Sequence, residues 1–180
     1  MSRYWRDSWP VLALALGFGL ALAAVERAIR PRIEEHARAR LEEAVLEVVP
    51  GGAAVEPRSV DGRGVHEVFA ASGAPAGWAF AAEAPGFQDR IRVMIGVDPE
   101  AARVVGLAVV ECRETPGLGD RIREREFRDR FAGRTAAPPL GVDAITGATI
   151  SSEAVVRAVE VELERTGGAI RREVARRRGP

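Results

Sequence analysis

The sequence predicts an α+β fold: an antiparallel sheet packed with helices, preceded by one N-terminal transmembrane helix. Three observations predict it, namely an apolar run at the N-terminus, short strand patterns in the middle of the chain, and helical patterns after them. Successive strands joined by short polar turns favour antiparallel pairing, and helices that follow the strands favour the α+β class. The 180 residues are enough for one folded domain and an appendage.

The apolar run covers Trp9–Val25 and has arginines on both sides. Its length lies at the lower end of the roughly 17–25 residues that cross a bilayer, and Trp5 and Trp9 stand where aromatic anchors meet the membrane surface. We therefore expect residues 1–27 to form a membrane anchor; the arginines on its two sides do not settle its orientation, and the short cytoplasmic N-terminus is what the family resemblance described below implies. A cleavable signal peptide is the alternative, because "ALA" at 21–23 resembles a cleavage site. A buried helix of a soluble domain is the third interpretation.

A helical pattern continues through residues 28–50, where apolar residues recur every four positions until "PGG" at 50–52 ends it. Pro31 indicates a kink or the start of a separate helix. The segment fits a stalk that leads from the membrane to the domain, and it fits the first helix of the domain equally well.

The region 51–168 is expected to form the α+β domain, beginning with strands. The patterns predict strands at 65–71, 78–84, 90–97 and 104–111. The third is the clearest, because apolar residues occupy every second position from Ile91 to Val97.

Helices are expected in the second half of the domain. A charged helix from about Asp120 to Phe131 directs Ile122, Phe127 and Phe131 towards the core. A final helix runs from about Ser151 to Glu164, places Val155, Ala158 and Val159 on one face, and ends at Gly167-Gly168. The basic tail, 169–180, is expected to be a solvated end, with contact to anionic lipid as the alternative.

Composition excludes several classes of site. The formal net charge is zero, so nothing indicates a nucleic-acid partner. Cys112 is the only cysteine, which excludes an intrachain disulfide and iron–sulfur ligation by this chain. His36 and His66 lack metal-ligand spacing, so no metal site is predicted.

Two loops carry residues suited to chemistry. "DAITGAT", Asp143–Thr149, opens the last helix, where unpaired N–H groups and the helix dipole attract an anion. The alternative is an ordinary capped helix start with Thr149 or Ser151 as the N-cap. "ETPGLGD", Glu114–Asp120, follows an apolar strand; its glycines allow close backbone approach to a ligand, although the same residues also make ordinary turns.

Together these loops resemble the FMN-binding domain family. "DAITGAT" is similar to the D-x-x-[ST]-G-A-T flavinylation motif of that family, and "ETPGLGD" is similar to its second signature. The order of the segments also matches over essentially the whole chain. The resemblance is closest to the G subunits of Rnf ion-translocating electron-transport complexes, and the C subunits of sodium-translocating NADH:quinone oxidoreductases are more distant.

The resemblance implies that Thr149 carries FMN through a phosphoester bond made by an external flavin transferase. It also implies a role for Asp143, which would help to deprotonate Thr149 or hold a metal ion during transfer. The remaining residues expected at the flavin are Thr146, Gly147, Ala148, Glu114, Thr115, Gly117, Leu118 and Gly119.

The implied function is electron transfer within a membrane-bound, ion-translocating redox complex of the Rnf type. The chain would be a single-pass protein of the cell inner membrane, with its soluble domain on the periplasmic side. Its expected partners are other subunits of the complex, the flavin transferase and membrane lipid. Because the chain lacks a nicotinamide-binding fingerprint, it would not be catalytic alone. The alternatives are an exported module that binds a phosphorylated ligand or a partner without a redox role, and a flavinylated domain of another extracytoplasmic electron-transfer route.

Overall fold

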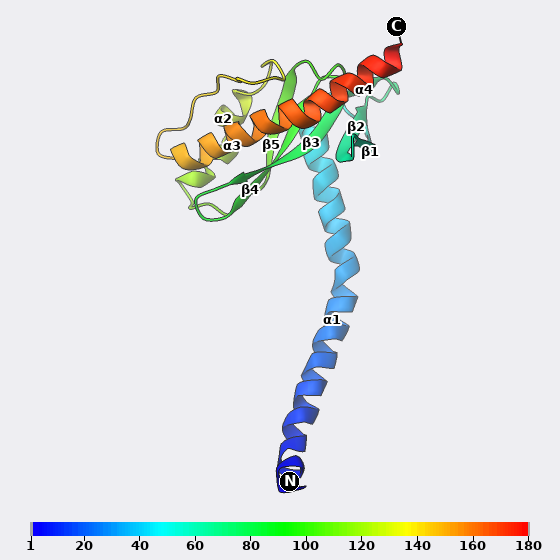
Figure 1. Ribbon diagram of the computed structural model, residues 1–180, viewed down its shortest axis with the longest axis vertical. Helices are drawn as coiled ribbons and strands as arrows, with labels where there is room; N and C mark the ends of the chain where they lie inside the picture. Colours follow the sequence, from blue (N-terminus) through cyan, green and yellow to red (C-terminus); the bar gives the residue numbers. More distant parts are fainter. Residues whose placement is uncertain (1, 180) are drawn as a thin grey trace. The chain divides into compact units, whose positions relative to one another are not determined.

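A computed structural model describes the backbone of residues 2–179 and the side chains of residues 8–33 and 35–179. The chain divides into two units, the first ending at Arg40 and the second beginning at Leu41. Helix α1 (Ser2–Val48) contributes to both. The second unit combines a five-stranded antiparallel sheet with helices (Figure 1), which confirms the predicted α+β class.

Helix α1 is continuous through Pro31, so no separate helix begins there. From Ser8 onwards it contains a stretch long and apolar enough to cross a membrane, and no part of that stretch is buried within the chain. Large apolar side chains such as Trp9, Phe18 and Leu22 are exposed on it. Exposed apolar surface on this scale needs a covering medium or partner.

The strands of the sheet lie side by side in chain order. They are β1 (Ala54–Val60), β2 (Arg63–Phe69), β3 (Pro75–Pro85), β4 (Arg90–Val97) and β5 (Val104–Glu111), and each neighbouring pair is antiparallel. Strand β1 was not predicted from the sequence. Pro57 lacks a backbone donor and charged residues flank it, a pattern tolerated only on an edge strand, which β1 is.

Alternation along β4 separates two cores. Ile91, Val93, Ile95 and Val97 join the core on one face of the sheet, as their spacing predicts, whereas Met94 joins the core on the other. The second core also holds the end of α1, where Ala44, Val45, Val48 and the following Val49 are buried. The last turns of α1 are therefore part of the domain.

The predicted helix at 120–131 is two short pieces, the 3₁₀ helix η1 (Gly119–Arg123) and α2 (Arg125–Asp129). Glu124 between them is extended, with φ −60° and ψ 137°. In one continuous helix Ile122 and Phe127 would point about 140° apart, and the break lets both enter the core together with Phe131. The three predicted core residues are thus confirmed, but the helix that was expected to carry them was wrong.

The last helix begins as α3 (Thr149–Glu162) and does not end at Gly167-Gly168. It passes through a π turn, η2 (Leu163–Gly167), into α4 (Gly168–Arg178), and the two helices run on across the sheet in Figure 1. Gly168 has helical backbone angles and both glycines are buried, so packing overrides their tendency to end a helix.

The basic end of the chain is docked instead of forming a free tail. Arg171 donates to the carbonyls of Ala101 and Ala136, and Arg177 pairs with the buried Glu67 at 2.8 Å. Arg177 also lies over the Trp78 ring, 5.3 Å from its centroid. These two arginines are held by groups of the domain, while most residues from 172 to 179 are exposed to solvent.

Close packing of α1 on the sheet gives a stability prediction. A Cβ at Gly96 would collide with the backbone carbonyl of Val48. We expect Gly96→Ala to lower the free energy of unfolding by about 1–3 kcal/mol through overpacking. Gly64→Ala is the matched control, because a Cβ there meets open space. Chemical denaturation of the solubilised chain measures the free energy of unfolding of both variants. Equal values for Gly96→Ala and Gly64→Ala would contradict the close packing of Val48 on Gly96.

Candidate functional site

A cavity of about 350 Å³ lies where three segments of the domain meet: the β3–β4 turn, the loop after β5, and the start of α3. It is lined by Phe87, Glu114, Thr115, Leu118, Gly119, Gly147, Ala148, Thr149, Ile150 and Ser151. The structure therefore brings the two loops singled out in the sequence to the walls of one cavity. Asp143, Thr146 and Gly117 are not among the lining residues.

Helix α3 begins without the side-chain cap that many helix N-termini have. A turn closed by the Ala148 N–H and the Ile145 carbonyl (2.9 Å) precedes it, and Gly147 supplies the positive φ of +84° that the turn requires. Ala148 occupies the N-cap position, and no side chain caps the helix. Neither Thr149 nor Ser151 is the N-cap, because the helix already begins at Thr149. The first N–H groups of α3 are left for a ligand or solvent.

Arginines hold the loop before α3 by its backbone. Arg121 donates to the carbonyl of Thr146 at 2.9 Å, and Arg130 donates to that of Asp143 at 3.1 Å. The hydroxyl of the fully buried Ser152 accepts a hydrogen bond from the N–H of Ile145 in the same loop. This framework fixes the turn and leaves the Thr149 side chain exposed at the cavity wall.

Glu114 is a buried carboxylate at the centre of the site, only 7% exposed. It accepts hydrogen bonds from the N–H groups of Phe87, Gln88 and Asp89, at 3.2, 3.0 and 3.4 Å. The Ser151 hydroxyl donates to the same carboxylate at 2.8 Å. One side chain thus joins all three segments around the cavity.

Hydrogen bonding determines the ionisation of this carboxylate. Burial by itself would raise the pKa of Glu114, but the donors on Gln88, Ser151, Asp89 and Phe87 outweigh burial. The net effect holds the pKa below the ordinary value of 4.5, so Glu114 is ionised at neutral pH.

Two glycines make room for Glu114. A Cβ at Gly119 would lie 2.6 Å from Oε2 of Glu114 and 2.8 Å from Oγ of Ser151, and a Cβ at Gly86 would collide with Oε1. Gly117 differs, since a Cβ there meets nothing, and its φ of +76° is what requires glycine. Gly119 is therefore required because Glu114 and Ser151 pack closely against it, whereas Gly117 is required because the turn needs a positive φ.

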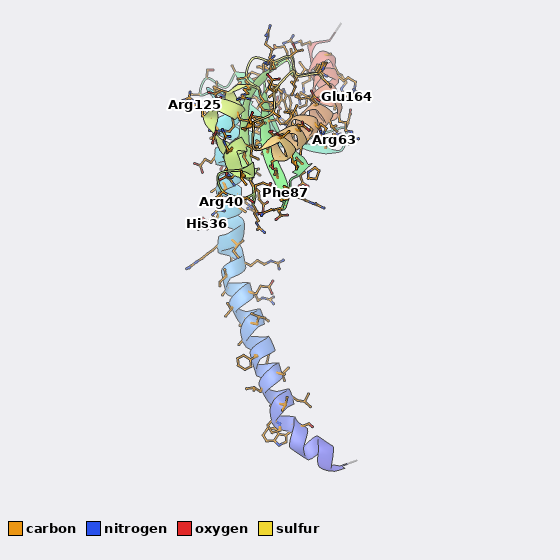
Figure 2. The ribbon with its side chains drawn as sticks, turned by 90° about the vertical axis from the view of Figure 1, so that its left-hand side faces the viewer. His36, Arg40, Arg63, Phe87, Arg125 and Glu164 are labelled. Carbon is orange, nitrogen blue, oxygen red and sulfur yellow. The ribbon has the colours of Figure 1, made fainter. Side chains whose placement is uncertain are left out.

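The cavity mouth is apolar. Phe87, Ile150 and Leu118 are 70%, 59% and 54% exposed, which is unusual for large apolar side chains around one cavity. Figure 2 shows Phe87 below Arg63 and Glu164 in that view. Phe87, Ile150 and Ser151 were not predicted as site residues from the sequence. For Phe87, an aromatic residue in a turn directly after a strand was the available signal.

Metal binding finds no support in the arrangement. Among the described residues, no group of three or more His, Cys, Asp or Glu side chains is placed to hold an ion. This gives no structural support to the expectation that Asp143 holds a metal.

The segments that surround the cavity match a flavin-binding class of domain. The FMN-binding domain family matches residues 86–164, a range that contains every residue lining the cavity. The chain is 33% identical over 181 residues to the G subunit of an ion-translocating oxidoreductase complex from Shewanella amazonensis, covering 83% of this chain and 84% of that one. The G subunit of the corresponding complex from Methanosarcina acetivorans is 33% identical over 136 residues, covering 68% and 72%. The chain belongs to this family of G subunits.

A solved structure supports the fold. The crystal structure of Shewanella oneidensis NqrC superposes with a TM-score of 0.56 at 21% identity, covering 73% of this chain and 72% of that chain. The shared architecture confirms the predicted arrangement of sheet and helices.

The ionised Glu114 gives a pH prediction. Because its pKa is lower in the folded than in the unfolded chain, it stabilises the fold at pH values above its unfolded pKa, and this contribution disappears as the pH falls through the folded value. We expect acidification below 4.5 to destabilise the wild type more steeply than Glu114→Gln. At neutral pH that variant should be less stable by about 1–3 kcal/mol, since it leaves buried donors unpaired.

Denaturation series at several pH values measure this effect. Glu83, whose pKa is also lowered, by Arg92, is present in both proteins, and so the difference between them isolates Glu114. Parallel pH profiles would show that Glu114 does not carry the acid-labile stability.

Proposed function

We propose that this chain is an electron-transfer subunit that carries FMN covalently on Thr149 within a membrane-bound, ion-translocating redox complex. The observation that carries the proposal is the exposed Thr149 at the uncapped start of α3, beside an apolar cavity and inside the sequence "DAITGAT". Family membership supports the same function, since the related G subunits are named as parts of ion-translocating oxidoreductases.

The chain offers complementary groups for the two ends of FMN. The first N–H groups of α3 and its dipole suit a phosphate bound to Thr149. The apolar side chains of Phe87, Leu118 and Ile150 suit the flat isoalloxazine ring. A cavity of about 350 Å³ lies within the range of small-ligand sites.

Attachment requires an accessible hydroxyl, and Thr149 has one. In the proposed transfer from FAD, a bond forms between Oγ of Thr149 and the phosphorus of the FMN half. The bond from that phosphorus to the bridging oxygen breaks, AMP leaves, and the hydroxyl proton passes to a base of the transferase. Asp143 is exposed and does not line the cavity, so we assign it to the surface that the transferase meets.

Bound FMN supplies one- and two-electron redox chemistry that side chains lack. The start of α3 would hold the phosphate end, and the apolar side chains of Phe87, Leu118 and Ile150 would surround the ring. The sequence has no nicotinamide-binding fingerprint and a single cysteine, which agrees with a flavin that exchanges electrons with other subunits of the complex.

The apolar part of α1 supports a single-pass membrane anchor. We place the FMN-bearing domain on the periplasmic side of the inner membrane, with other subunits of the complex and lipid as its partners. A flavin transferase acts on the chain during maturation.

Substitution of the attachment residue tests the proposal. Thr149→Ala, co-expressed with a flavin transferase, should lose all covalent flavin and still fold, because the variant removes only an exposed hydroxyl and methyl group. Denatured protein on a gel under ultraviolet light gives the readout, since only covalent flavin survives denaturation.

Thr146→Ala is the matched control. Thr146 is an exposed threonine of the same turn, does not line the cavity, and uses its backbone carbonyl to hold Arg121. We expect it to keep the fluorescent band. A band that persists in Thr149→Ala would assign the bond to another residue.

Topology is tested by reporters fused after Gly179, beyond the end of α4. Alkaline phosphatase should be active there and a cytoplasm-dependent fluorescent reporter should be dark. The reverse pattern would contradict the periplasmic assignment. A mature N-terminus near Ala24 would replace the anchor with a cleaved signal peptide.

A further inference from the structure

The β3–β4 turn is held by a residue outside it. Three consecutive N–H groups, those of Phe87, Gln88 and Asp89, point to the Glu114 carboxylate. Within the turn, the Gly86 N–H donates to the Asp89 carbonyl. The position of the Phe87 side chain therefore depends on a residue 27 positions later in the chain.

The same carboxylate is tied to the helix that bears Thr149. Ser151 is in the first turn of α3 and is 2% exposed, and its hydroxyl donates to Oε2 of Glu114. A direct chain of contacts thus runs from α3 through Ser151 and Glu114 to Phe87, across the base of the cavity.

Glu114 differs from Glu67, the other buried glutamate among the described residues. Glu67 has two arginine partners, Arg58 and Arg177, whereas Glu114 is held by the uncharged donors of the β3–β4 turn and Ser151. A buried carboxylate held in this way is costly unless it is fully hydrogen-bonded. Gly86 and Gly119 leave just enough space for it, and a methyl group at either position would displace it.

We propose that Glu114 and Ser151 form a positioning clamp that sets the distance between Phe87 and the flavin on Thr149, holding the Phe87 ring against the isoalloxazine. This inference rests on the proposed function and adds the residue pair that fixes the flavin environment. Glu114 is a positioning residue, because it acts on the flavin through Phe87.

A tryptophan at position 87 reports the distance. An indole in contact with an isoalloxazine quenches flavin fluorescence by donating an electron to the excited ring, whereas phenylalanine does not. In the full chain loaded with FMN, Phe87→Trp should reduce flavin emission several-fold. Adding Glu114→Gln or Ser151→Ala should release the turn and restore much of that emission.

Glu67→Gln in the Phe87→Trp background is the matched control. It neutralises another buried glutamate of the same domain, outside the cavity lining, and should leave the quenching unchanged. Ser151→Ala removes a single donor, so it keeps the test decisive if Glu114→Gln folds poorly. The oxidised-flavin absorption spectrum should shift in the two clamp variants and stay constant in the control.

The results distinguish the positioning clamp from the covalent attachment of FMN to Thr149. Unchanged quenching in both clamp variants, or no quenching in Phe87→Trp, overturns the clamp while covalent flavin on the gel supports the attachment. Loss of the covalent band in Glu114→Gln would place Glu114 in attachment and likewise overturn positioning. A wild-type chain without a covalent band would overturn both the proposed function and this inference.

Discussion

The buried carboxylate of Glu114 is the constraint on which the candidate site depends. It lies where the β3–β4 turn, the loop after β5 and the start of α3 meet, and it accepts hydrogen bonds from the turn and from the helix. An unpaired charge at this depth would be strongly unfavourable, so the donors must stay in place for the charge to be tolerated. The same requirement keeps Gly119 free of a side chain. Three segments distant in sequence are thereby held around one cavity.

The rest of the domain provides a rigid base for that arrangement. The sheet carries a core on each face, one closed by the end of α1 and the other by α3 and its neighbours. At the far end of the last helix, Arg177 is fixed by Glu67 and by the Trp78 ring. Helix α3 itself is held by its buried apolar face, where Ala154, Val155 and Val159 join the core, and its uncapped first turn lies beside the cavity. Because Thr149 is exposed, a transferase could reach its hydroxyl, as the proposed function requires. The open, apolar cavity mouth suits the proposed electron exchange with a partner.

Apolar spacing and turn residues in the sequence predicted the elements whose formation depends on neighbouring residues in the chain. The alternation in β4 is of this kind, and so is the start of the last helix directly after Gly147-Ala148. Tertiary contacts decided the remainder. Strand β1 pairs in spite of Pro57 because it is an edge strand, and the helix continues past Gly167-Gly168 because α4 docks on the sheet. Phe87 and Ser151 escaped prediction because their place at the cavity depends on hydrogen bonds to Glu114, and no sequence spacing indicates these contacts.

The central claim is that Thr149, and no neighbouring hydroxyl, carries FMN. Tandem mass spectrometry of the tryptic peptide from Thr135 to Arg157 tests it most directly, because this peptide contains Thr146, Thr149 and both buried serines. We expect a mass increase of FMN less one water, with fragment ions that assign it to Thr149. An unmodified peptide from protein matured with an active flavin transferase, or fragments that assign the mass to Thr146 or to a serine, would contradict it.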